Sequence, residues 1–111
     1  MKYIVEYLTS LDACQDGIND YVKHNGDLLK IEPQYYLWAV KYIPDFEVDH
    51  NHLDWCAEQK PWEALKYAAN LLTLERLDWC AERGPWLALK YAADLLTLER
   101  LDWCKRKACQ L

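Results

Sequence analysis

The sequence contains little glycine and proline and almost no phenylalanine. Its 111 residues include 3 Gly, 4 Pro and a single Phe. An all-β fold with many turns needs more glycine and proline than this, and a disordered chain has fewer apolar residues than the 52% found here. The composition therefore predicts one small, helix-rich domain with a sizeable core.

The sequence also lacks a long apolar run, a basic leader and a catalytic signature. No stretch reaches the roughly 18 apolar residues that indicate a membrane helix. The opening MKYIVEYLTS has none of the basic and long apolar regions of a signal peptide. No Gly-rich phosphate loop, nucleophile elbow or His-Glu-x-x-His motif occurs. We expect a cytoplasmic protein that is not an enzyme and has no cofactor and no membrane partner.

Positive charge is scarce in the first half of the chain. Residues 1–53 carry nine acidic residues and four lysines, a net charge of −5, whereas residues 54–111 carry nine residues of each sign. Direct binding to nucleic acid needs a basic face, so the acidic half disfavours it. The same half favours a partner protein with a basic surface.

Repetition is the most prominent feature that is present. Residues 54–77 and 78–101 are identical at 20 of 24 positions. The four differences are Gln59/Arg83, Lys60/Gly84, Glu63/Leu87 and Asn70/Asp94. A fixed short period is the signature of a repeat architecture, and we predict an all-α fold of two-helix repeats stacked as a small α-solenoid.

Each repeat contains start and stop signals for two short helices. Thr73 is a good N-cap, Gly84 can end the first helix, and Pro85 suits the first position of the second. These signals predict helix pairs at 74–83 and 85–96, repeated at 50–59 and 61–72. A lone helix of about ten residues is marginal in water, so the helices must stack on neighbours.

The pattern extends beyond the clean copies, and we predict a single domain over residues 1–111. Residues 33–53 fit a degenerate repeat whose helix ends at Pro44 and is recapped by Asp49. Residues 102–111 fit a C-terminal cap helix with a basic last turn.

Residues 1–32 are predicted to form an acidic N-terminal helical cap. Ser10 can cap a helix whose core side carries Leu11, Cys14, Ile18 and Val22. Residues 2–8 fit either a helix or a strand, and we favour a short helix because a lone strand has no partner.

Two groups of residues could carry chemistry, and both have a simpler structural interpretation. An odd count of 5 cysteines argues against a disulfide framework, and four of them recur in a Leu-Asp-x-Cys motif, which predicts small buried thiols. His50, His52 and Cys56 could hold zinc, which leaves a metal-dependent enzyme as a third alternative. Because Arg76 and Arg100 replace His52 in the other repeats, we expect no metal there.

The tryptophans recur at two repeat positions, giving the sets Trp55, Trp79 and Trp103, and Trp62 and Trp86. Within a stack of helices such residues are expected to pack between layers. If the indoles reach the surface instead, they form a regularly spaced aromatic binding strip.

A resemblance to a known group rests on two kinds of motif. The repeats contain Asp-Trp-Cys-Ala-Glu and Pro-Trp-x-Ala-Leu-Lys-Tyr-Ala-Ala, and the opening reads Leu8-x-x-Leu11-x-Ala13-Cys14-x-x-Gly17-Ile18. Over most of the chain these motifs resemble small, uncharacterised helical-repeat proteins of phages and prophages. By analogy, the resemblance implies an inhibitor of a host defence, as anti-CRISPR proteins are, or of a nucleic-acid enzyme, working in the host cytoplasm.

Two surfaces are candidate sites for a protein partner. One is an acidic stripe expected on a helix face, formed by Asp12, Asp16 and Asp20 with Asp27 nearby. Its simpler interpretation is a solvated face, and its functional one is a patch that docks on a basic protein. The other surface holds Leu87 and Lys90, although Leu87 also suits packing on the cap helix. The alternative function is a structural or self-assembling module, which allows a homo-oligomer.

Overall fold

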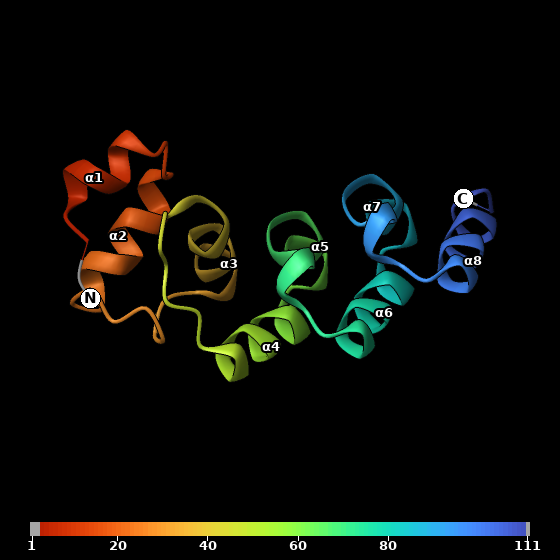
Figure 1. Cartoon of the computed structure of the whole chain (residues 1–111). Coiled ribbons are helices and arrows are strands. Elements are labelled where there is room, and N and C mark those ends of the chain that lie inside the picture. Colours follow the sequence, from red (N-terminus) through yellow and green to blue (C-terminus); the bar gives the residue numbers. More distant parts are fainter. Residues whose placement is uncertain (1–2, 111) are drawn as a thin grey trace.

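The computed structural model describes residues 3–110, and within that range the chain is helical without any strand (Figure 1). The α-helices are α1 (Val5–Ser10), α2 (Gln15–Lys23), α3 (Pro33–Tyr42), α4 (His50–Gln59), α5 (Pro61–Ala68), α6 (Leu74–Arg83), α7 (Pro85–Tyr91) and α8 (Leu98–Ala108). Two 3-10 turns follow α5 and α7, at η1 (Ala69–Leu71) and η2 (Ala93–Leu95). The prediction of an all-α fold is confirmed.

The repeat helices begin where their capping residues predict. The Thr73 hydroxyl accepts a hydrogen bond from the N–H of Arg76 at 3.2 Å and so starts α6. Asp49 caps α4 in the same way, through the N–H of His52 at 3.0 Å. The second helix of each unit is shorter than predicted, because the backbone leaves the α conformation at Ala68 and Ala92 and continues as a 3-10 turn.

The N-terminal cap differs from the prediction at its first turn. Ser10 is the last residue of α1 and does not cap the next helix. Asp12 turns the chain with a φ of 63°, a conformation that Asp tolerates better than most residues. Helix α2 begins after Cys14, whose Sγ accepts from the N–H of Gly17 at 3.4 Å. The short helix favoured for residues 2–8 is present from Val5 onward, and residue 2 lies outside the described residues.

The helices from α3 to α8 lie in two adjoining rows (Figure 1). Helices α3, α5 and α7 pack side by side in one row, and α4, α6 and α8 follow one another in the second. Helices α1 and α2 lie beside α3, at one end of these rows. The described part of the chain measures 44 × 24 × 21 Å.

Small side chains let the two rows approach closely. Cys56, Cys80 and Cys104 are all 0% exposed, and each occupies the same position of its helix in the second row. Buried alanines recur on both rows, at Ala57, Ala64, Ala81 and Ala88. The prediction of buried thiols is confirmed for these three cysteines. It is wrong for Cys14, which is exposed because its thiol caps α2 instead of joining the core.

Candidate functional site

The acidic residues of the N-terminal half do not share one helix face. Asp16 is exposed on α2, whereas Asp12 is exposed in the turn before that helix. Asp27 lies after α2, where it accepts from the N–H of Leu29 at 3.1 Å and lies 3.9 Å from the Lys30 ammonium. The expected single stripe is therefore wrong in its geometry, because α2 starts later than predicted.

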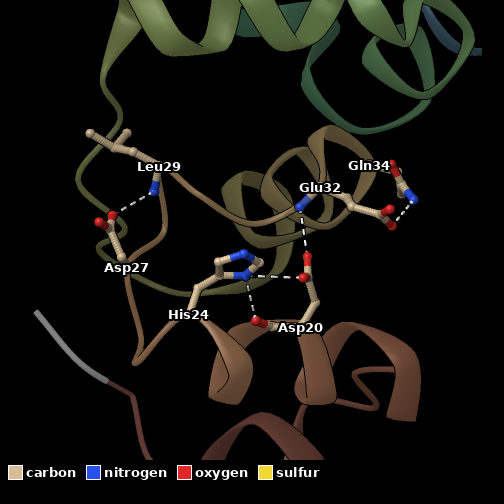
Figure 2. A network of polar contacts seen from close by, with 6 residues as sticks. All are labelled: Asp20, His24, Asp27, Leu29, Glu32 and Gln34. Atoms are coloured by element: carbon tan, nitrogen blue, oxygen red, sulfur yellow. Dashed lines mark hydrogen bonds and ion pairs between the residues drawn. The ribbon is translucent and has the colours of Figure 1, made fainter.

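Asp20 joins two helices and is not a free surface charge (Figure 2). One carboxylate oxygen accepts the backbone N–H of Glu32 at 2.7 Å, at the start of α3. The other lies 3.1 Å from Nδ1 of His24, and the side chain is only 13% exposed. Asp20 thus fixes the connection between α2 and α3.

The repeats neutralise part of their negative charge through arginines. Arg76 of α6 binds both carboxylate oxygens of Asp54 on α4, at 2.6 and 2.9 Å, and lies 3.9 Å from Glu58. Arg100 repeats this on α8, 3.0 Å from Glu82 and 3.6 Å from an Asp78 oxygen. Each arginine therefore links one unit to the carboxylates of the unit before it.

The first unit of the second row carries a histidine where the others carry arginine. The His52 ring packs edge-on against Tyr36, with 4.5 Å between ring centroids, and stacks on Trp55 at 5.4 Å. Burial lowers the pKa of His52, which favours a neutral ring.

The candidate metal ligands do not converge. His50 is exposed at the start of α4, while Cys56 points into the core and burial raises its pKa to about 12. Within residues 3–110 no group of three or more His, Cys, Asp or Glu side chains is placed to hold a metal ion.

Some of the tryptophans are half-buried between helices, and others are exposed at the surface. Trp79 and Trp103 are half-buried, and guanidinium groups lie over their rings: Arg76 and Arg83 over Trp79, at 4.8 and 3.5 Å, and Arg100 over Trp103 at 4.8 Å. In contrast, Trp55 is 46%, Trp62 57% and Trp86 55% exposed, so packing between layers is wrong for these three.

One sequence difference between the repeats follows from Trp62. Its indole N–H donates to the Arg83 carbonyl at 3.1 Å, and a Cβ on Gly84 would lie 3.0 Å from the ring. Glycine at position 84 thus makes room for the indole of the preceding unit.

The two candidate residues of the repeat surface have different environments. Leu87 is half-buried and packs against the core. Lys90 is exposed, with its ammonium 5.7 Å from the Trp86 ring and 5.3 Å from the Tyr91 ring. Only Lys90 is therefore fully available to a partner.

A cavity of about 380 Å³ lies where α1, α2, α3 and α5 meet. Its wall is mostly apolar and includes Leu8, Ile18, Ile31, Trp38, Ala39 and Ile43. Of the charged side chains in the described part of the chain, only those of Asp12 and Glu63 line it, and Gln34 contributes a carboxamide. Sequence reasoning missed this site, because its lining residues come from four helices and from the segments that connect them, over positions 8 to 67.

No protein-family model, curated protein or solved structure matches the chain. Across residues 3–110 every helix is too short or too polar to cross a lipid bilayer. Function must therefore be inferred from the surfaces and the cavity described above.

Proposed function

We propose that this chain is a small α-solenoid that acts without catalysis by binding another protein, whose basic surface docks on the acidic N-terminal half. The unbalanced charge of that half carries the proposal. Exposed carboxylates of Glu6, Asp12, Asp16, Asp45 and Glu47 have no ion-pair partner among residues 3–110. The negative potential that they create attracts a basic partner and speeds its association.

Apolar side chains exposed in the same half support a protein partner. Ile4 is 66%, Val22 55% and Leu29 52% exposed, and Val5 is also exposed. Protein interfaces combine an apolar contact area with charges that orient the partner.

The resemblance to phage and prophage proteins favours one version of this function. In that version the chain inhibits a host defence, as anti-CRISPR proteins do, or a nucleic-acid enzyme, in the host cytoplasm. An acidic protein can occlude the basic surface with which such an enzyme holds nucleic acid.

Affinity capture from host lysate, with mass spectrometry of the retained proteins, tests the proposal. The test variant combines Glu6→Lys with Asp16→Lys, and the control combines Glu75→Lys with Glu99→Lys. All four residues are exposed and second in their helices, so both pairs change the charge and the helix-dipole interaction equally. We expect the wild type and the control to retain a basic protein, which high salt elutes. The test variant should not retain this protein. Equal retention by both variants would reject the acidic half as the docking surface.

The alternative of a self-assembling module has its own support in the repeats. Trp62, Trp86 and Leu98 are exposed there, the last at 81%. Light scattering coupled to size exclusion, over a range of concentrations, distinguishes the two functions. A monomer at every concentration is expected for the inhibitor, and a mass that rises with concentration for the module.

A further inference from the structure

We infer that the cavity bordered by α1, α2, α3 and α5 is a binding site for a small organic cation, an aromatic or alkyl amine. This inference does not depend on the protein partner proposed above. Three independent features support it: the size and apolar wall of the cavity, the sign of the charge at its edge, and one unpartnered polar atom.

The size and wall of the cavity suit the apolar part of such a ligand. Its volume of about 380 Å³ lies within the range of small-molecule pockets, about 300–1,000 Å³. Ile18, Ile31 and Trp38 offer aliphatic and aromatic surface, and the Tyr35 ring adds a second aromatic wall. An aromatic or alkyl body leaves water by entering this space.

The charged groups of the cavity select a cation. Asp12 and Glu63 line it, and among residues 3–110 no Lys, Arg or His does. Neither carboxylate has an ion-pair partner within the described part of the chain. An ammonium group near them gains Coulomb energy, whereas an anion is repelled.

Gln34 supplies an acceptor for the donor of the ligand. Its Nε2 donates to the Glu32 carboxylate at 2.9 Å, which fixes the orientation of the carboxamide. Its Oε1 points away from Glu32 (Figure 2) and is buried without a hydrogen-bond partner among residues 3–110. A buried acceptor without a donor destabilises the fold, and because Gln34 lines the cavity, a turn of its carboxamide toward the ligand would let an ammonium N–H satisfy it.

The duplicated unit provides a matched comparison for Glu63. The equivalent residue is Leu87, in a unit that is otherwise almost identical and equally helical. Glu63→Leu therefore places at position 63 the residue that the fold already accepts at position 87, and Glu63→Gln removes the charge with little change of shape. Glu99→Gln on α8 is the control, because Glu99 is exposed and does not line the cavity.

Three probes with one phenyl body test the assignment: phenethylamine, 2-phenylethanol and 3-phenylpropanoate, which are cationic, neutral and anionic. Each is titrated into ¹⁵N-labelled protein, and the amide shifts are followed by NMR. We expect saturable shifts at Gly17, Gln34 and Ala39 with phenethylamine, and an affinity for the anion that is at least about tenfold lower. Binding of the alcohol as tight as that of the amine, or shifts confined to the exposed tryptophans, would overturn the proposal.

The variants then test the individual groups. Glu63→Gln and Glu63→Leu should weaken phenethylamine binding several-fold and reduce its advantage over 2-phenylethanol, while Glu99→Gln should change neither. Gln34→Leu should weaken the amine with the amide spectrum still dispersed, which shows that the fold is kept. Unchanged amine affinity in either the Glu63 variants or Gln34→Leu would contradict the site. If phenethylamine does not bind but a capped Phe-Lys dipeptide does, the small-molecule assignment is wrong. The cavity then binds a segment of a partner protein.

Discussion

In the repeats, Arg76 and Arg100 each bind carboxylates of the preceding unit, whereas in residues 3–53 most exposed carboxylates have no cation beside them. The two regions are built from the same kind of short helix. They differ in what their charges do: in the repeats charges hold neighbouring units together, and in the N-terminal half they remain available.

Asp20 and Asp54 make this contrast more precise. Both are partly buried and both accept strong hydrogen bonds, Asp20 from a backbone N–H and Asp54 from Arg76. A carboxylate in either region can therefore be structural. The net charge of −5 in residues 1–53, against zero in residues 54–111, and not the presence of carboxylates, is what leads us to propose the N-terminal half as a surface for a basic partner.

The largest contrast between the regions is expected in thiol reactivity. Cys14 in the N-terminal half is exposed, whereas burial raises the pKa of Cys56 from 9.0 to about 12 and that of Cys80 to about 11. The shift at Cys56 alone lowers its thiolate fraction about a thousandfold at neutral pH. Labelling with N-ethylmaleimide, followed by peptide mass spectrometry, should modify Cys14 and Cys109 fast and the core thiols slowly.

All five cysteines should label at similar rates in denaturant, which controls for the reagent. Fast labelling of Cys56 in the folded protein would contradict this prediction. It would show that the reagent reaches the interior of the repeats as readily as it reaches Cys14.

Enlarging one cysteine in each region should have unequal effects on stability. Cys80→Leu places extra volume where the side chain is 0% exposed, so we expect it to lower the free energy of unfolding by about 1–3 kcal/mol. Cys14→Leu loses only a weak cap and should cost about 0.5 kcal/mol or less. Chemical denaturation of both variants measures the difference, and equal losses would contradict it.

Breaking one arginine link should have a smaller effect. Arg76→Ala removes the paired hydrogen bonds to Asp54 and the contact with Trp79, and should cost about 1–2 kcal/mol. Arg106→Ala on α8 is the control, with an expected change within about 0.5 kcal/mol, because Arg106 is exposed. The difference should shrink in high salt. If the two variants are equally stable, the arginine links do not stabilise the repeats.

The smallest effect is expected from His52, which stands where the other units have arginine. Its pKa is lowered by burial, so the unfolded chain, with an ordinary value of 6.5, binds a proton before the folded chain does. Stability should therefore be unaffected above this pH and fall slightly as pH drops through it. Urea denaturation between pH 8 and pH 5 should show a shallower loss in His52→Gln than in the wild type, and identical pH profiles would exclude this role for His52.

The repeats could be predicted from local signals, because caps and prolines act on their own segment. Thr73, Asp49 and Pro85 define helix starts that the structure reproduces. The 3-10 ends of α5 and α7 carry no comparable signal, so both helices were predicted too long.

The N-terminal half was predicted less well, because long-range contacts and an unusual turn decide its structure. The left-handed conformation of Asp12 moves the start of α2, and the bond from Asp20 to the backbone of Glu32 spans 12 positions. The residues that line the cavity extend from Leu8 to Tyr67 in the sequence, so no local pattern predicts it. The need for glycine at position 84 could not be predicted locally either, because its neighbour Trp62 lies in the previous unit.

The association rate of the captured partner shows whether the acidic N-terminal half is the docking surface. We would measure it by biolayer interferometry for the wild type, for Glu6→Lys with Asp16→Lys, and for Leu87→Glu with Lys90→Glu. We expect an association rate about tenfold or more lower for the first variant at low salt, converging with the wild type at high salt, and little change for the second. An unchanged rate for the first variant, with binding lost in the second, would contradict the account and place the binding surface on the repeats.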